Sequence, residues 1–186
     1  MRIMKKLVSV LMCVCLLASA SACGKKDVTN ATANIEIISP ESVVTLEMAE
    51  EATGVNMVMT PEGDYDGSAR TVTYVPETTG EADPVSVRIE QFSDSLTTDQ
   101  VWNNYELNRI RRSDSEIISG IGKDCYIAYP YICVYDRGCY IKIMAGSGNS
   151  QVQKDTLINL ASQAVKVIED TITEEDEENG RGNVIN

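Results

Sequence analysis

Apolar and polar residues alternate along several short stretches of the chain, a period of two that is typical of strands with one buried face. The clearest stretches are 71–75 and 85–92, separated by a loop that Pro76 and Pro84 bound. Other short apolar runs with turn-forming residues between them also favour strands. These runs are 55–60, 125–129, 131–135 and 139–145. The pattern therefore predicts an antiparallel β-sheet of about five to seven strands.

Three longer stretches carry apolar residues three and four positions apart, which is typical of amphipathic helices. The first, 45–54, has Thr45 as its N-cap and ends at Gly54. The second covers 97–112, and the third, 150–170, has the longest apolar face. The order is helix, strands, helix, strands, helix. It predicts an α+β fold, an α/β sandwich in which helices pack on one face of the sheet.

The order of turn residues also predicts how the last two strands pair. Asp136-Arg137-Gly138 is typical of a tight hairpin turn. With the turn centred on Arg137 and Gly138, Cys133 lies opposite Lys142 and Tyr135 lies opposite Tyr140.

Tyrosines gather in these strands and suggest a binding face. Because side chains alternate, Tyr131, Tyr135 and Tyr140 point away from the neighbouring isoleucines. If the isoleucines face the helices, the three tyrosines lie on the outer face, where amphipathic rings suit partner binding. Cross-strand packing without a binding role is the alternative.

The N-terminal 22 residues have the three parts of an export signal: a basic start, an apolar run over 7–18 and a small-residue end. The apolar run is shorter than the ~20 residues that span a bilayer. Ala20-Ser21-Ala22-Cys23 resembles the bacterial lipobox, whose cysteine receives a diacylglyceryl thioether. We therefore predict a lipoprotein signal peptide over 1–22 and lipidation at Cys23. An ordinary cleaved signal that leaves Cys23 as a free thiol is the alternative.

The rest of the chain is predicted to have three parts after this signal: a tether, a globular domain and a tail. Residues 23–40 are predicted to be the lipidated cysteine and a flexible tether, and 41–172 the globular domain. Residues 173–186 contain a run of five acids followed by glycines and are predicted to be an acidic, disordered tail.

Charge narrows the classes of function. The chain has a formal net charge of −12, a pI near 4.4 and no histidine. The net negative charge argues against the basic surface that nucleic-acid binding requires. The lack of histidine excludes catalysis by histidine and metal ligation by histidine. Removal of the signal takes away three positive charges and brings the charge to −15. An anionic domain is repelled by an anionic leaflet, so attachment to the bilayer is expected through the acylated Cys23.

Three cysteines remain beyond the signal and the anchor: Cys125, Cys133 and Cys139. In an exported chain they permit one structural disulfide, and three buried thiols are the alternative. Cys125 and Cys139 are expected to share a face, whereas Cys133 and Cys139 point to opposite faces. Their spacing has no Cys-x-x-Cys, which argues against a thiolate metal site.

Three other motifs have simpler explanations than a site. The acidic loop 62–68 lacks the twelfth-position glutamate of an EF-hand. The glycine-containing stretch 146–150 lacks the lysine of a P-loop and is expected to cap the last helix. Arg109, Arg111 and Arg112 form a small cationic spot that suits a carboxylate or acidic partner, although cations at a helix C-terminus also compensate the helix dipole. No metal site, cofactor or catalytic residue is predicted.

The lipobox, the helix ending at Gly54, and the stretch Gly120-Ile121-Gly122-Lys123-Asp124-Cys125-Tyr126 before a hairpin and a last helix resemble small bacterial cell-envelope lipoproteins of unknown function. Their domain is a compact α/β sandwich. The chain departs from their pattern at Cys125, where a small residue is usual. The resemblance implies a binding or accessory role and supplies no catalytic residues.

We therefore expect a lipid-anchored, non-catalytic binding module on the outer face of the bacterial cytoplasmic membrane, or on the outer membrane if the host has one. Its expected partner is a protein, peptide or glycan of the envelope and not a nucleic acid. A small-solute-binding lipoprotein and a wall-active hydrolase with paired carboxylates are the alternatives.

Overall fold

The computed structural model describes residues 37–62, 69–93, 96–146 and 151–180. The expected signal peptide, Cys23 and nearly all of the expected tether lie outside the described residues. So do positions 63–68 of the acidic loop and 147–150 before the last long helix.

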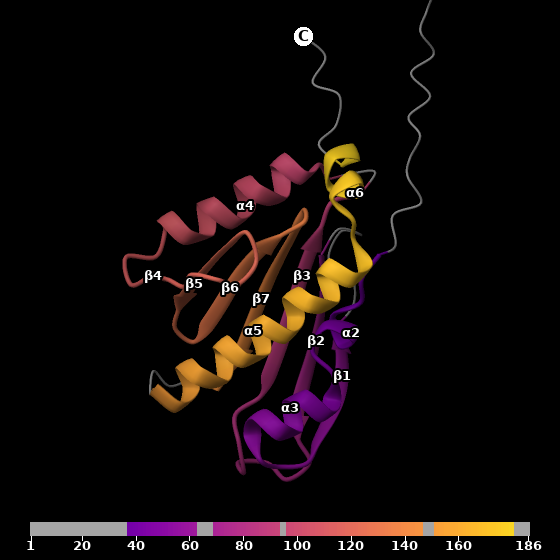
Figure 1. Cartoon of the computed structure of the whole chain (residues 1–186). Helices are drawn as coiled ribbons and strands as arrows, with labels where there is room; N and C mark the ends of the chain where they lie inside the picture. Colours follow the sequence, from indigo (N-terminus) through magenta and orange to yellow (C-terminus); the bar gives the residue numbers. More distant parts are fainter. Residues whose placement is uncertain (1–36, 63–68, 94–95, 147–150, 181–186) are drawn as a thin grey trace, which may run out of the picture. The chain divides into compact units, whose positions relative to one another are not determined.

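The described residues form an α+β domain, shown in Figure 1. Its helices are α2 (Pro40–Val43), α3 (Leu46–Thr53), α4 (Thr98–Ile110), α5 (Gln151–Thr171) and α6 (Glu174–Asn179). Its strands are β1 (Met57–Glu62), β2 (Ala69–Pro76), β3 (Val85–Gln91), β4 (Glu116–Ile117), β5 (Asp124–Ala128), β6 (Tyr131–Asp136) and β7 (Cys139–Ala145).

All seven strands belong to one antiparallel sheet with the order β1-β2-β3-β7-β6-β5-β4. Two meanders, β1–β3 and β4–β7, join where β3 pairs with β7. The predicted fold class, an antiparallel sheet with packed helices, is confirmed. The predicted hairpin register is also correct, because Cys133 pairs with Lys142 and Tyr135 with Tyr140.

One face of the sheet carries the expected aliphatic side chains and packs on α5. Paired positions such as Ile89 and Ile141, or Val134 and Ile141, present apolar side chains to this face. The buried face of α5 supplies the matching residues at helical spacing. These are Leu157, Leu160, Ala161, Ala164, Val165 and Ile168. Burial of such side chains stabilises the fold by roughly 1.5–3 kcal/mol for each large residue.

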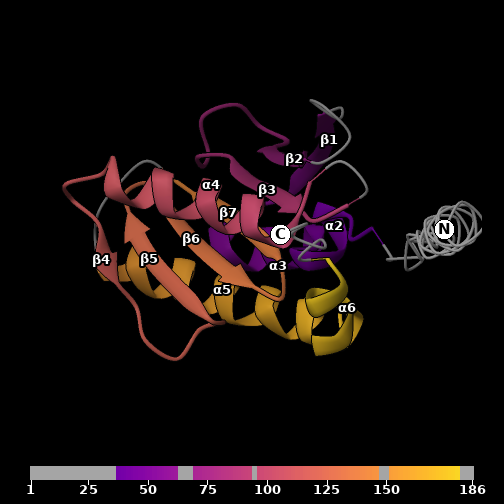
Figure 2. The same cartoon turned by 90° about the horizontal axis from the view of Figure 1, so that it is seen from above.

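The other face of the sheet is covered as well, which corrects the prediction that helices pack on one face. Figure 2 shows α4 on one side of the strands and α5 on the other. The α4 side chains Val101 and Tyr105 are completely buried. Since α4 also has a weaker apolar stripe than α5, its sequence predicted a helix without indicating the face on which it packs.

Local sequence signals account for the ends of the elements. Thr45 and Thr97 cap α3 and α4, each accepting a hydrogen bond from the backbone N–H three residues later. The β6–β7 hairpin turns through Arg137 (φ 43°) and Gly138 (φ 73°), the two left-handed residues of a tight turn. A Cβ on Gly138 would also lie 2.5 Å from the Phe92 ring. The position therefore requires glycine for two reasons, its positive φ and this close approach.

The first part of the predicted acidic tail, 173–186, forms the short helix α6, and residues 181–186 lie outside the described residues. Thr173 caps the short helix α6, and the Gly180 carbonyl accepts a 2.9 Å hydrogen bond from the Thr98 N–H. Lys123 Nζ lies 3.1 Å from Glu177 Oε1. The helix is therefore docked beside the start of α4.

The domain also begins slightly before the predicted boundary at residue 41. Ile38 is buried, and its N–H donates a 2.9 Å hydrogen bond to Gln91 Oε1 of β3. Within the described ranges, no helix combines the length and apolar character needed to cross a bilayer.

Candidate functional site: a cationic pocket beside α4

The predicted exposed tyrosine face is wrong for two of its three members. Tyr135 and Tyr140 are only 3% and 5% exposed, because α4 covers them. The Trp102 ring meets Tyr135 edge-on at 4.8 Å between centroids, and Tyr105 meets Tyr140 edge-on at 5.5 Å. Such aromatic packing adds roughly 0.5–1.5 kcal/mol per pair beyond burial. These rings belong to the core, and only Tyr131 is partly exposed.

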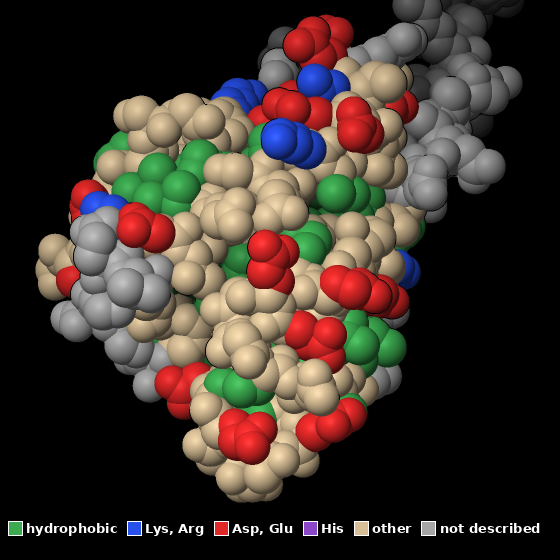
Figure 3. All heavy atoms as spheres, turned by 60° about the horizontal axis from the view of Figure 1, so that its bottom comes forward, with side chains coloured by type: hydrophobic (Ala, Val, Ile, Leu, Met, Phe, Trp, Pro, Cys, Tyr) green, Lys and Arg blue, Asp and Glu red, His purple; other side chains and the backbone are tan. Residues whose placement is uncertain are grey.

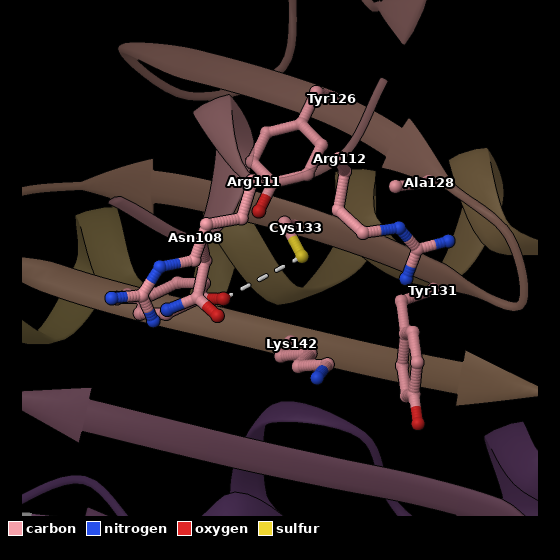
Figure 4. A pocket seen from close by; sticks show the side chains of 9 residues that line it. Asn108, Arg111, Arg112, Tyr126, Ala128, Tyr131, Cys133 and Lys142 are labelled. Carbon is pink, nitrogen blue, oxygen red and sulfur yellow. Dashed lines mark hydrogen bonds between the residues drawn. The ribbon is translucent and has the colours of Figure 1, made fainter. Parts of the chain in front are cut away.

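Beyond the C-terminal end of α4, the same face of the sheet opens into a pocket of about 90 Å³, shown in Figure 4. Its lining comes from the end of α4, the residues just after it, and strands β5, β6 and β7. The lining residues are Asn108, Arg111, Arg112, Tyr126, Ala128, Tyr131, Cys133, Tyr140 and Lys142. We refer to this cavity as the α4 pocket.

Strand register explains why these side chains meet. Lys142 pairs with Cys133, and Cys133 pairs with Tyr126, so the three side chains form one row across the sheet. Directly opposed residues of antiparallel strands lie on the same face. The row continues to Ile117 on the β4 edge and to Arg88 on β3. The floor of the pocket is thus set by backbone pairing.

Arg112 is held at one wall by three hydrogen bonds. Its Nε and Nη2 donate to the two carboxylate oxygens of Asp114 at 2.9 and 2.8 Å, and Nη2 also donates to the Tyr129 carbonyl at 2.7 Å. The Arg112 guanidinium lowers the pKa of the Asp114 carboxyl. Asp114 thereby offsets the charge of Arg112 while fixing its position.

Two further cations lack a carboxylate partner within the part of the chain that the structure describes: Arg111 and Lys142. Lys142 Nζ lies 3.8 Å above the centroid of the Tyr131 ring, a cation–π contact that leaves its charge uncompensated. Arg111 is exposed at the rim. In Figure 4, Arg112 with Tyr131 and Arg111 with Asn108 lie on opposite sides of Cys133.

The centre of the floor combines a thiol with phenol groups. Cys133 Sγ lies 3.7 Å from the Tyr140 hydroxyl. Burial raises the pKa of Cys133, Tyr126 and Tyr140 above their ordinary values. All three groups therefore stay protonated near neutral pH, where they offer hydrogen-bond donors rather than nucleophiles.

These features suit the capture of a small anion. The lining carries three cations and no acidic side chain, and Asp114 offsets only one of them. A volume of about 90 Å³ accepts a group the size of a carboxylate, whereas pockets for whole metabolites are larger, at roughly 300–1,000 Å³. Figure 3 shows acidic side chains spread over another face of the molecule.

The arginine spot seen in the sequence is thus divided by the structure. Arg109 pairs with Glu106 of its own helix through Nε and Nη2, both at 3.0 Å, whereas Arg111 and Arg112 line the pocket. The sequence reasoning missed Lys142 as a site residue. The available signal was a lysine inside an apolar strand, placed by the hairpin register opposite Cys133 and beside the tyrosines.

Cys125, Cys133 and Cys139 are free, buried thiols, so no disulfide joins them in the structure. Cys125 and Cys139 share the face that packs on α5, as expected from alternation. Strand β6 lies between them, which separates them by roughly 10 Å or more and exceeds the ~7 Å limit for a disulfide. Cys133 points to the opposite face, toward α4.

A second hollow, of about 540 Å³, lies beside α6. Its lining contains both signs of charge, because Lys123 and Arg137 lie next to five carboxylates. The acidic members are Asp136, Glu169, Glu174, Glu177 and Glu178. Among the described residues, no group of three metal-ligating side chains has an arrangement that would hold an ion.

The comparisons with known proteins add no relative: no protein-family model, curated protein or solved structure matches this chain.

Proposed function

We propose that this chain is an exported, lipid-anchored binding protein of the bacterial envelope, and that the α4 pocket is its ligand site. The sequence supports the anchor through the signal pattern of 1–22 and the lipobox ending at Cys23. The structure supports a binding role through one observation, a pocket with two uncompensated cations on a strongly acidic molecule. Among the functions considered from the sequence, this observation favours a small-solute-binding lipoprotein whose solute carries an anionic group.

The physical argument is electrostatic. A ligand anion entering the pocket meets Arg111 and Lys142 without displacing a carboxylate, and the row of paired strands holds Lys142 in place. Hydrogen bonds to charged groups contribute about 1.5–3 kcal/mol each. Two such contacts give about 3–6 kcal/mol, and the cost of association reduces this to binding in the millimolar range. The net charge of −12 repels anions in general, so binding depends on the local cations of this pocket.

Titration of the full chain in non-ionic detergent with acetate and inorganic phosphate at low salt tests the ligand site. We expect saturable, millimolar binding of anions that Arg111→Gln combined with Lys142→Gln weakens at least tenfold. Arg109→Gln is the matched control, because Arg109 belongs to the same helix but pairs with Glu106 outside the pocket. Equal loss in the control, or no saturable binding by the wild type, would contradict the proposal.

The anchor requires a separate test in a bacterial host. Cys23→Ser is expected to abolish acyl-lipid labelling and to release or mislocalise the protein. Membrane retention that is unchanged in this variant would refute lipid attachment and leave the pocket assignment untouched.

A further inference from the structure

Exposed apolar side chains occur on α4 and β4 next to residues that line the α4 pocket, although none of them lines the cavity itself. We call the two that neighbour a lining residue, Leu107 and Ile117, the apolar rim. Six large hydrophobic residues are exposed among the described residues, and three of them belong to α4 and β4: Leu107, Ile110 and Ile117. They are 44%, 67% and 51% exposed.

The register places Ile117 at the edge of the pocket. Ile117 pairs with Tyr126, which lines the cavity, so its side chain extends the Lys142–Cys133–Tyr126 row outward on the same face. Because β4 has only two residues and lies at the end of the sheet, no further strand flanks Ile117 on its outer side.

The end of α4 carries the other member of the rim, Leu107. Leu107 lies one turn before Arg111, since residues four apart are neighbours on a helix surface. Ile110 lies three residues after Leu107 and directly precedes Arg111. Leu107 therefore adjoins Arg111, whereas Ile110 projects from a different side of the helix than Asn108 and Arg112, which line the pocket. Figure 1 shows β4 close to this end of α4.

From this arrangement we infer that the ligand is a monocarboxylate with a short apolar body. Its carboxylate enters the pocket between Arg111 and Lys142, and its carbon chain or ring covers Ile117 and the end of α4. A planar carboxylate matches the guanidinium geometry, and the cavity is too small for the whole ligand. The apolar rim disfavours a fully hydrated tetrahedral anion. This inference rests on the proposed function and names the ligand class for the same site.

The test compares four probes with the full chain in non-ionic detergent: 3-phenylpropionate, acetate, 3-phenylpropanamide and inorganic phosphate. Titration of micelles alone corrects for partitioning of the aromatic probes. We expect 3-phenylpropionate to bind at least tenfold more tightly than acetate or phosphate, because its apolar body is buried against the rim. The neutral amide should bind at least tenfold more weakly than the carboxylate.

Two matched variants locate the apolar contact. Ile117→Ser should weaken 3-phenylpropionate binding threefold to tenfold and leave acetate binding unchanged. Val58→Ser is the control, because Val58 is similarly exposed, at 43%, on the edge strand at the other end of the sheet. An effect of Val58→Ser equal to that of Ile117→Ser would overturn the assignment of the rim.

The outcomes separate the two proposals. If acetate and phosphate bind as tightly as 3-phenylpropionate, the apolar-ligand inference fails and the anion site stands. If the amide binds as well as the carboxylate, the cations play no part and the proposed function fails. If none of the probes binds, both proposals are wrong.

Discussion

Two buried tyrosine hydroxyls differ in their hydrogen bonding, and this difference sets the cost of removing each one. The Tyr74 hydroxyl donates a 2.5 Å hydrogen bond to the Val44 carbonyl and ties β2 to the segment after α2. The Tyr105 hydroxyl of α4 has no hydrogen-bond partner within the described structure, although its ring packs among several other aromatics. A buried polar group without a partner costs free energy that a bonded one does not.

We therefore predict opposite effects for the same chemical change at these two positions. Tyr105→Phe should leave the free energy of unfolding unchanged or raise it by up to about 1 kcal/mol, because it removes an unsatisfied hydroxyl. Tyr74→Phe should lower it by about 1 kcal/mol or more, because the Val44 carbonyl loses its donor. Denaturant unfolding of both variants measures this difference, and a larger loss in Tyr105→Phe would show that its hydroxyl has a partner.

Asp136 at the end of β6 is a buried carboxylate whose charge is poorly compensated. It is 8% exposed, and its Oδ2 has no hydrogen bond among the described residues and lies 3.9 Å from Arg137 Nε. Burial, with the nearby Glu169 and Glu177, raises its pKa above the ordinary 3.8. Arg137 and a backbone hydrogen bond from Lys123 act in the opposite direction.

The sign of this shift predicts a pH-dependent effect of Asp136→Asn. Because the folded state holds the Asp136 proton more tightly than the unfolded state, the carboxylate destabilises the fold once the pH exceeds its raised pKa. Asp136→Asn should therefore raise the free energy of unfolding by about 1 kcal/mol at pH 7. The gain should shrink as the pH falls toward 3.8. A gain of equal size at pH 7 and pH 3.8 would contradict the role of the charge.

At the scale of elements, α6 shows why an acidic run is not sufficient evidence of a disordered tail. Thr173 caps it, Lys123 pairs with Glu177, and Gly180 lies so close to Phe92 that an added Cβ would overlap the ring. These contacts come from residues far away in the sequence. Composition alone therefore predicted that the acidic run is solvated. It could not identify the distant residues that contact the helix.

Removal of α6 should consequently affect the body of the domain. A chain that ends after Thr173 is expected to lose about 1–2 kcal/mol of stability, because the Thr98 N–H loses its partner and Phe92 is uncovered. The single tryptophan, Trp102, lines a hollow together with Glu177, so its fluorescence should shift to longer wavelength. Glu177→Gln removes only a surface ion pair and should cost less than about 0.5 kcal/mol. Unchanged stability and fluorescence in the shortened chain would support a solvated tail.

The strands were predictable because their signals are local. Alternation predicted β2 and β3, and short apolar runs between turn-forming residues predicted β5, β6 and β7. The turn at Arg137 and Gly138 predicted the register that places Lys142 opposite Cys133. The face covered by α4 was not predictable in the same way, because it depends on contacts between Tyr105 and strands more than 20 residues further along. The α4 pocket lies where this helix ends. The sequence therefore did not predict the pocket, even though the register predicted for the β6–β7 hairpin was correct.

On the scale of the whole molecule, negative charge is the dominant electrostatic feature. The formal charge of −12 produces self-repulsion in the compact state. Apart from the pair between Arg137 and the buried Asp136, the described ion pairs lie at or near the surface, where each contributes little. Screening by salt should therefore relieve more repulsion than it weakens attraction.

We accordingly predict that the melting temperature rises by several degrees between 0.01 and 0.3 M NaCl, where the screening length falls from about 30 Å to less than 8 Å. A neutral solute at equal osmolality serves as the control, because it changes solvation without screening charge. A melting temperature that falls with salt would mean that attractive pairs outweigh the net repulsion. Anion binding in the α4 pocket should weaken over the same range, because the same ions screen Arg111 and Lys142.

The pairing of β3 with β7 has a consequence for the order of folding. Its partners are roughly 50–60 residues apart, so closing this contact costs more chain entropy than forming the hairpins on either side of it. The α4 pocket draws all its residues from 108–142, on one side of that junction. The α4 pocket can therefore assemble from near-neighbour contacts first, and the β1–β3 meander joins it in the slower step.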